Sequence, residues 1–218
     1  MFDYVSFGGL ALLLGFKHSY DPDHIIVVAN FLRKAGTLKS AVRVSLSWAA
    51  GHMITAAIVT TLLYAFRESV LHIFLANFER VVGVVLIALG LFSMKDFFSL
   101  HSHTHKHEGT EHSHPHAHSS AGQIGKHAHK HMFGIGMVHG LASNDELLIL
   151  FTASLGLTTL GNILLGVAVF SVGVVIGMVV FALLFSYPLL KTRSKVLYKA
   201  ITLITGAASV WYGLLMLN

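Results

Sequence analysis

The sequence predicts an all-α polytopic membrane protein, and three observations support this class. Hydrophobic residues make up 54% of the 218 residues and charged residues only 11%, whereas soluble domains average about 25% charged residues. Several apolar runs reach the roughly 20 residues that a helix needs to cross a bilayer. The chain contains no cysteine, so a disulfide or a thiolate metal site is excluded, and metal chemistry must use His, Asp, Glu, Met or backbone oxygens.

Six membrane-spanning helices are predicted from the apolar runs. The amino terminus lacks a basic region of the kind that begins a cleaved signal peptide, so the first run is taken as a retained span. Between the second and third spans, Glu68–Arg80 fits a short helix, either in the membrane interface or outside the membrane. The expected spans are Tyr4–Leu32, Ser40–Phe66, Val81–Leu100, Met132–Leu157, Gly161–Leu190 and Val196–Met216.

The segment His101–His131 interrupts this pattern with a run of histidines. It holds eleven of the sixteen histidines and almost no apolar residue, so it cannot form a core and we expect it to be disordered without metal. It divides the chain into a first three-span repeat (residues 1–100), a histidine-rich loop (101–131) and a second three-span repeat (132–218). Alternating histidines bind borderline divalent cations, which predicts a metal-buffering loop, although a solubilising linker is the simpler reading. The histidines are His101, His103, His105, His107, His112, His114, His116, His118, His127, His129 and His131.

The basic residues predict the orientation in the membrane. With six spans, twelve of the fifteen Lys and Arg residues fall on the side of the histidine-rich loop, and only Arg67 and Arg80 fall on the opposite side. Lys17 is the fifteenth and lies inside the first span. The positive-inside rule therefore places the loop in the cytoplasm and both termini outside, in a multi-pass protein of the cell membrane.

The two halves of the chain have similar sequence motifs at an offset of about 121 to 126 residues. GFKH followed by DHII in the first half resembles GMVH followed by DELL in the second, and Gly83 and Gly90 have the same spacing as Gly206 and Gly213. Three duplicated spans would insert in opposite directions, because an odd number of spans inverts the second copy. The pattern predicts two inverted three-helix repeats with a substrate site near the membrane midplane.

The first span carries the densest set of polar residues, in the string KHSYDPDHI. On a straight helix, His18 would point away from Asp23 and His24, so the three side chains could not serve one ion. Pro22 cannot donate a hydrogen bond to the carbonyl of His18 and is expected to kink or break the helix there. Buried ionisable groups in a membrane are costly, which favours a cation site over a set of residues that only holds helices together.

Two further elements could complete such a site. His52 in the second span follows Gly51, which would allow a close approach to the first span, so His52 is a candidate ligand, although a lone histidine is often structural. In the fourth span, His139 and Glu146 would share a helical face with Asp145 beside them. The alternative for this second group is a polar helix end at the membrane boundary.

These residues resemble the signatures of the nickel/cobalt transporter family. KHSYDPDHI is similar to the family's pattern of His, four residues, Asp and His within a span, and the region Ser47–Thr55 is similar to its Gly-His signature in the next span. The stretch from His139 to Glu146 is loosely similar to a third signature, whereas Val169–Met178 lacks the family's aspartate-rich motif. The short chain resembles the compact branch that includes urease-accessory-type nickel permeases. The resemblance implies metal contacts from His18, Asp23, His24 and His52, and less directly from Asp145 and Glu146.

The expected function is therefore transport of a divalent transition-metal cation, with Ni²⁺ first, Co²⁺ second and Zn²⁺ third, and with uptake favoured over efflux. Imidazole and carboxylate ligands suit these ions better than Mg²⁺ or Ca²⁺. Zinc or nickel/cobalt export and a membrane metal sensor or chaperone are the alternatives, and no enzyme, cofactor or nucleic-acid partner is expected. The expected partners are the lipid bilayer, the metal ion and a cytoplasmic metallochaperone as a candidate, with the oligomeric state open.

Overall fold

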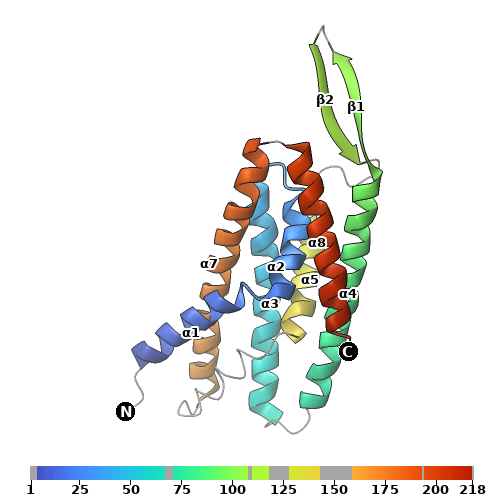
Figure 1. Ribbon diagram of the computed structural model, residues 1–218. Helices are drawn as coiled ribbons and strands as arrows, with labels where there is room; N and C mark the ends of the chain where they lie inside the picture. Colours follow the sequence, from blue (N-terminus) through green and yellow to red (C-terminus); the bar gives the residue numbers. More distant parts are fainter. Residues whose placement is uncertain are drawn as a thin grey trace.

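A computed structural model describes residues 4–66, 71–107, 110–117, 128–142, 159–192 and 194–217. In these ranges it contains seven helices and a two-stranded hairpin (Figure 1). The helices are α1 (Tyr4–His18), α2 (Pro22–Leu32), α3 (Leu38–Phe66), α4 (Leu71–Ser99), α5 (Ala128–Ala142), α7 (Leu160–Thr192) and α8 (Lys195–Leu215). The predicted helical class is confirmed for the bundle that these helices form.

The first predicted span is broken where the sequence indicated. Asp21, the residue before Pro22, has an extended backbone (φ −62°, ψ 142°), and Pro22 occupies the first turn of α2. A residue that precedes proline is disfavoured in the helical region, and proline itself is well tolerated at the start of a helix. The chain therefore stops as α1 and restarts as α2, and it changes direction at the break (Figure 1).

Within the described ranges, three helices are long and apolar enough to cross a membrane: Leu38–Leu62, Glu79–Phe98 and Leu160–Thr192. Large apolar side chains are exposed on the outside of the bundle, as expected for a surface that faces lipid. They include Leu13, Val84, Phe92, Leu165 and Trp211. These features indicate a helical membrane protein.

Two segments differ from the expectations. Residues 71–80 are not a separate interfacial helix but the first turns of α4. No glycine or proline stands between Leu71 and Gly83 to end the helix. In the histidine-rich loop, β1 (Leu100–His107) and β2 (Thr110–Ala117) pair as an antiparallel hairpin rather than being disordered.

The register of this hairpin follows the alternation of its sequence. His101 pairs with His116, His103 with His114, and His105 with His112. A period of two residues is the period of a strand, so the His-X-His repeat places its histidines at positions on one face of the hairpin.

The helices pack in pairs that join the two halves of the chain. α1 packs along α7 and α3 packs along α5, while α4 packs along α8 and α3 along α7. Glycines permit the closest approaches. A Cβ atom added at Gly83 would lie 2.8 Å from the carbonyl oxygen of Gly213, and one at Gly213 would lie 2.6 Å from that of Gly83. Small residues of this kind let membrane helices come into backbone contact.

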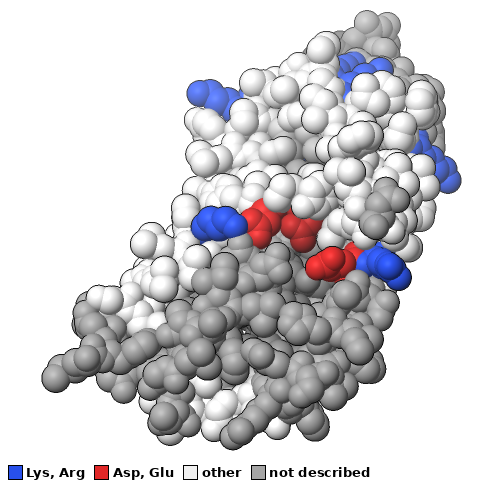
Figure 2. Space-filling view, turned by 60° about the horizontal axis from the view of Figure 1, so that its bottom comes forward, with Lys and Arg blue, Asp and Glu red and all other residues white. Residues whose placement is uncertain are grey.

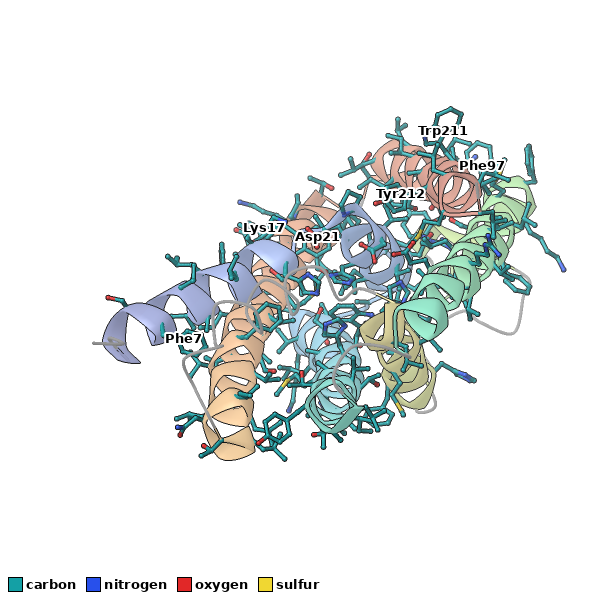
Figure 3. The ribbon with its side chains drawn as sticks, turned by 90° about the horizontal axis from the view of Figure 1, so that it is seen from below. Phe7, Lys17, Asp21, Phe97, Trp211 and Tyr212 are labelled. Carbon is teal, nitrogen blue, oxygen red and sulfur yellow. The ribbon has the colours of Figure 1, made fainter. Side chains whose placement is uncertain are left out.

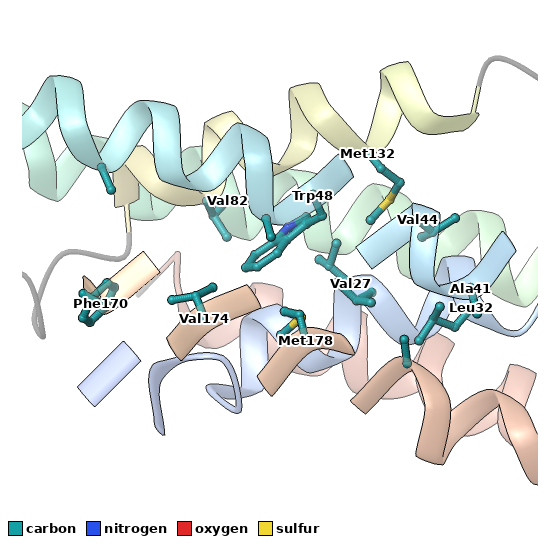
Figure 4. Packing of buried hydrophobic residues seen from close by; sticks show 14 of the residues in the cluster. Val27, Leu32, Ala41, Val44, Trp48, Val82, Met132, Phe170, Val174 and Met178 are labelled. Atoms are coloured by element: carbon teal, nitrogen blue, oxygen red, sulfur yellow. The ribbon is translucent and has the colours of Figure 1, made fainter. Parts of the chain in front are cut away.

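The buried apolar core lies in the middle of the bundle. Trp48 of α3 is completely buried, and Figure 4 shows it among Val27 of α2, Met132 of α5 and Met178 of α7. Because these four helices meet at Trp48, the polar residues one turn away on α2 and α3 are enclosed on several sides.

Candidate metal site

Four buried histidines form the most polar part of the bundle interior. His18, His24, His52 and His139 are all fully or almost fully buried, with exposed fractions of 0 to 1%. They come from the end of α1, the start of α2, the middle of α3 and the last turn of α5. The break at Pro22 brings the first two together, since the rings of His18 and His24 are only 4.6 Å apart between centroids.

Three of these histidines could bind a single ion. His18, His24 and His52 each offer a nitrogen, and these atoms lie within 4.8 Å of one another. The Nε2 atoms of His18 and His52 are 3.3 Å apart. Two nitrogens bound to one ion at 2.0–2.1 Å would be about 2.9 Å apart at a right angle and about 3.4 Å apart at the tetrahedral angle. The observed separation fits this range without rearrangement of the backbone.

Hydrogen bonds to backbone carbonyls set the tautomer of two rings. Nδ1 of His24 lies 3.0 Å from the carbonyl oxygen of His18, and Nδ1 of His139 lies 3.0 Å from that of Ile135. A carbonyl can only accept, so each Nδ1 donates its hydrogen and the Nε2 of each neutral ring keeps its lone pair. Neither Nε2 has a hydrogen-bond partner among the described residues.

The carbonyl oxygen of His18 orients the ring of His24. In a continuous helix this oxygen would accept from the N–H of residue 22, but Pro22 has no N–H to donate. The oxygen accepts from the Asp21 backbone N–H at 3.1 Å as well as from the His24 ring. The proline therefore breaks the helix and supplies the acceptor that fixes the second imidazole.

Asp21 orients the ring of His18, the other histidine at the helix break. Its Oδ2 lies 2.9 Å from Nδ1 of His18, which turns the Nε2 lone pair of His18 toward His52. Lys17 lies 3.5 Å from the other carboxylate oxygen of Asp21, and its side chain is 65% exposed. A carboxylate behind a histidine is a common device for orienting metal ligands. Asp21 was not among the predicted site residues, although its position three residues after His18 places both on one face of a straight helix.

Asp23, an expected acidic ligand, lies beside the ring of His24. Its Oδ2 lies 3.4 Å from Nε2 of His24, and the residue is 5% exposed. It stands in the first turn of α2, where the positive end of the helix dipole favours a carboxylate.

Trp48 forms one wall of the histidine cluster. Its ring stacks on His52 with a centroid distance of 5.1 Å and an angle of 21°, and it meets the edge of His24 at 4.8 Å. Trp48 and His52 are four residues apart on α3, a spacing that could have predicted their contact. The buried indole therefore shields this side of the cluster from water.

The structure brings His18, His24 and His52 together and places Asp23 and His139 next to His24; that these residues bind metal stays a prediction. Asp145 and Glu146 lie outside the described residues, so their predicted place in the cluster stays a prediction. Of the eleven loop histidines, only His131 has a described side chain, and it is exposed in α5.

The chain is similar along nearly its whole length to one characterised protein. It is 26% identical over 215 residues to the urease accessory protein UreH of Bacillus sp. (strain TB-90), covering 97% of this chain and 90% of that protein. No profile of a known protein family matches the chain, and no solved structure is similar to it.

Proposed function

We propose that this protein transports a divalent transition-metal cation, Ni²⁺ in the first place and Co²⁺ in the second, across the cell membrane. The observation that carries the proposal is the buried set of His18, His24 and His52, whose nitrogens lie within 4.8 Å of one another. Neutral imidazoles and one carboxylate suit borderline cations such as Ni²⁺, Co²⁺ and Zn²⁺. The similarity to a urease accessory protein agrees with the resemblance to the compact nickel permeases of the nickel/cobalt transporter family.

Charge balance supports a divalent ion as the substrate. The neutral rings carry no charge, so the negative charge close to the ion comes from Asp23 beside His24 and from Asp21 behind His18, the latter partly offset by Lys17 at 3.5 Å. Burying a divalent cation without such compensation would be prohibitive in a membrane interior. A transported ion must also leave the site. A site with few charged ligands and several neutral ones suits this requirement, because it binds the ion less tightly.

For this function we propose an architecture of six spans arranged as two inverted repeats. The repeats are residues 1–100 and 132–218, and the loop 101–131 lies between them. Reciprocal contacts at several glycines support this architecture, because a contact made by one half has a counterpart made by the other. A Cβ at Gly15 would meet the backbone of Phe170, and one at Gly136 would meet that of Trp48. A Cβ at Gly83 would meet the carbonyl oxygen of Gly213, and one at Gly90 would meet that of Gly206. A two-fold axis between equivalent halves produces such pairs.

The proposed orientation keeps the hairpin in the cytoplasm and both termini outside. The first residue of α1 and the last of α8 lie toward the end of the bundle away from the hairpin (Figure 1). Basic residues are concentrated at the hairpin end, where α2 gives way to α3 and α7 to α8. The loop histidines would then collect ions at the inner mouth, where a metallochaperone could exchange metal with them.

Flux into liposomes tests the proposal. Purified protein is reconstituted with a metal-sensitive dye inside, and Ni²⁺, Co²⁺, Zn²⁺ and Mn²⁺ are added outside with and without a pH gradient. We expect flux of Ni²⁺ and Co²⁺ that His18→Ala abolishes and that His131→Ala, a change at an exposed histidine, leaves intact. Equal flux in wild type and His18→Ala would contradict the proposal, and a response of the protein without any flux would favour a sensor.

A further inference from the structure

A second set of buried polar residues lies away from the histidines, between α2, α4 and α8. Asn30 and Arg33 of α2 are 5% and 6% exposed, and Asp96 of α4 is 7% exposed. The buried face of α8 carries Thr202, Thr205 and Ser209. Polar groups in a membrane interior are costly, so a continuous row of them requires an explanation beyond packing. We call this row the polar seam.

An ion-pair cluster occupies one end of the polar seam. Asp96 Oδ2 accepts from Arg33 at 2.8 Å and from Lys34 at 2.6 Å. The Arg33 guanidinium also lies within 3.5 Å of the hydroxyls of Tyr198 and Thr202 on α8. Asp96 stands one turn before the end of α4, where the chain enters β1, so the cluster lies at the hairpin side of the bundle (Figure 1).

The other end of the polar seam reaches the histidine cluster. α2 runs from Asp23 and His24 at its first turn to Arg33 at its C-terminus. Ten residues of helix rise about 15 Å, which is half of the roughly 30 Å hydrocarbon core of a bilayer. The spacing therefore suits a site at mid-membrane and an ion-pair cluster at the membrane boundary.

Side chains bridge the interval between the two ends. Asn30 Nδ2 donates to Ser209 Oγ at 2.6 Å, and its Oδ1 has no partner among the described residues although it is buried. Tyr212 lies one turn further along α8. Figure 3 shows Tyr212 on the side of α8 that faces the bundle interior and Trp211 on the outer side.

On the face of the bundle away from the hairpin, a side chain that contacts the histidine cluster is partly exposed. The Asp21 side chain is 22% exposed, although its partner His18 is fully buried. Figure 2 shows acidic side chains in a short row on this face, with a basic side chain at each end. The histidine cluster thus comes close to the surface on the face away from the hairpin, while the ion-pair cluster covers its route to the hairpin side.

These observations point to a gated path, and we propose that the polar seam is the route between the histidine cluster and the hairpin side, closed in this conformation by the Arg33–Asp96–Lys34 cluster. The inference rests on the proposed transport function. When the cluster opens, Asp96 is released from two cationic partners and presents a carboxylate to the departing or entering cation. The oxygens of Asn30 and Ser209 then lie on the way between that carboxylate and His24. Hydrogen bonds to charged groups are each worth about 1.5–3 kcal/mol, so the loss of one shifts the balance between closed and open states by about tenfold or more.

Cysteine accessibility tests the proposal directly, because the chain has no cysteine of its own. Ser209→Cys places one thiol in the polar seam, and Ser45→Cys is the matched control, since Ser45 is equally buried but lies on α3. A membrane-impermeant thiol reagent is added to the hairpin side of the reconstituted protein. We expect Asp96→Asn to increase the labelling rate of Ser209→Cys by about tenfold or more and to leave that of Ser45→Cys unchanged. An unchanged rate at Ser209→Cys, or an equal increase at both positions, would overturn the proposal.

A second variant keeps the test decisive if Asp96→Asn does not fold. Arg33→Met with Asp96→Leu replaces the ion pair by apolar side chains of similar volume, which buried ion pairs often tolerate. We expect this double variant to bind Ni²⁺ in detergent like the wild type and to lose flux by about tenfold or more, since no charged pair remains to separate. Wild-type flux in the double variant would overturn the gate. Failure of the wild type to bind or transport Ni²⁺ would instead overturn the proposed function, and the cysteine labelling, which needs no metal, would still report on the gate.

Discussion

Removing the carboxylate behind His18 tests how the histidine cluster is held ready for metal. Asp21 Oδ2 accepts from His18 Nδ1 at 2.9 Å, a hydrogen bond to a charged group worth about 1.5–3 kcal/mol when buried. Because the Asp21 side chain is 22% exposed, we take the lower end of that range, about 1.5 kcal/mol. Asp21→Ala should therefore weaken Ni²⁺ binding by about tenfold. Loss of a carboxylate that hydrogen-bonds to a metal-binding histidine typically lowers metal affinity by about 10- to 100-fold, so this value is at the lower limit.

Two milder changes serve as controls for Asp21→Ala. Asp21→Asn keeps an acceptor for the His18 ring but loses the charge, so its effect should be smaller, about threefold. Lys17→Gln removes only the exposed partner of Asp21, 3.5 Å away, and should change affinity by less than about fivefold because exposed ion pairs are worth at most about 1 kcal/mol.

Tryptophan fluorescence provides an assay that the loop histidines do not disturb. The chain has two tryptophans, and Trp48 stacks on His52 whereas Trp211 is 67% exposed. In a Trp211→Phe background, quenching by Ni²⁺ then reports occupancy of the histidine cluster alone. If Asp21→Ala were quenched at the same Ni²⁺ concentration as the parent protein, the claim that Asp21 prepares His18 for metal would be refuted.

The remaining predictions concern the site, the helix contacts and the hairpin. His24→Ala removes a ring whose Nδ1 is already held by a carbonyl and whose Nε2 faces the cluster, so it should abolish flux and Trp48 quenching. Gly83→Ala should destabilise the protein by about 1–3 kcal/mol in thermal unfolding, because the new methyl group would lie 2.8 Å from the carbonyl oxygen of Gly213. Gly134→Ala, at a position with open space around it, should be neutral or slightly stabilising, and equal losses at the two glycines would contradict the packing argument. Deleting residues 102–130 should slow flux at low metal concentration without abolishing it; complete loss would show that the loop is part of the path.

The sequence was most informative where one residue type forces a local geometry. Pro22 predicted the break in the first span, and with it the meeting of His18 and His24, because proline removes a donor and restricts the residue before it. The repeated Gly spacing in the third and sixth spans was interpreted only as internal symmetry, and in the structure these glycines lie where α4 packs closely on α8.

The contacts that depend on tertiary packing were harder to predict. The ion pair between Arg33 and Asp96 joins residues far apart in the chain, and no periodicity connects them. The interfacial helix was predicted wrongly from charged residues at its ends, because a helix without glycine or proline continues through such charges. The hairpin was missed because composition was given more weight than the strand-like alternation of its histidines.

The position of a bound ion tests the central claim most directly. Crystals of the full chain grown with Ni²⁺ and measured at the nickel absorption edge would reveal each site by its anomalous signal. We expect one peak in the bundle, about 2.1 Å from the Nε2 atoms of His18 and His24. Peaks confined to the hairpin, with the histidine cluster empty at saturating Ni²⁺, would contradict the account.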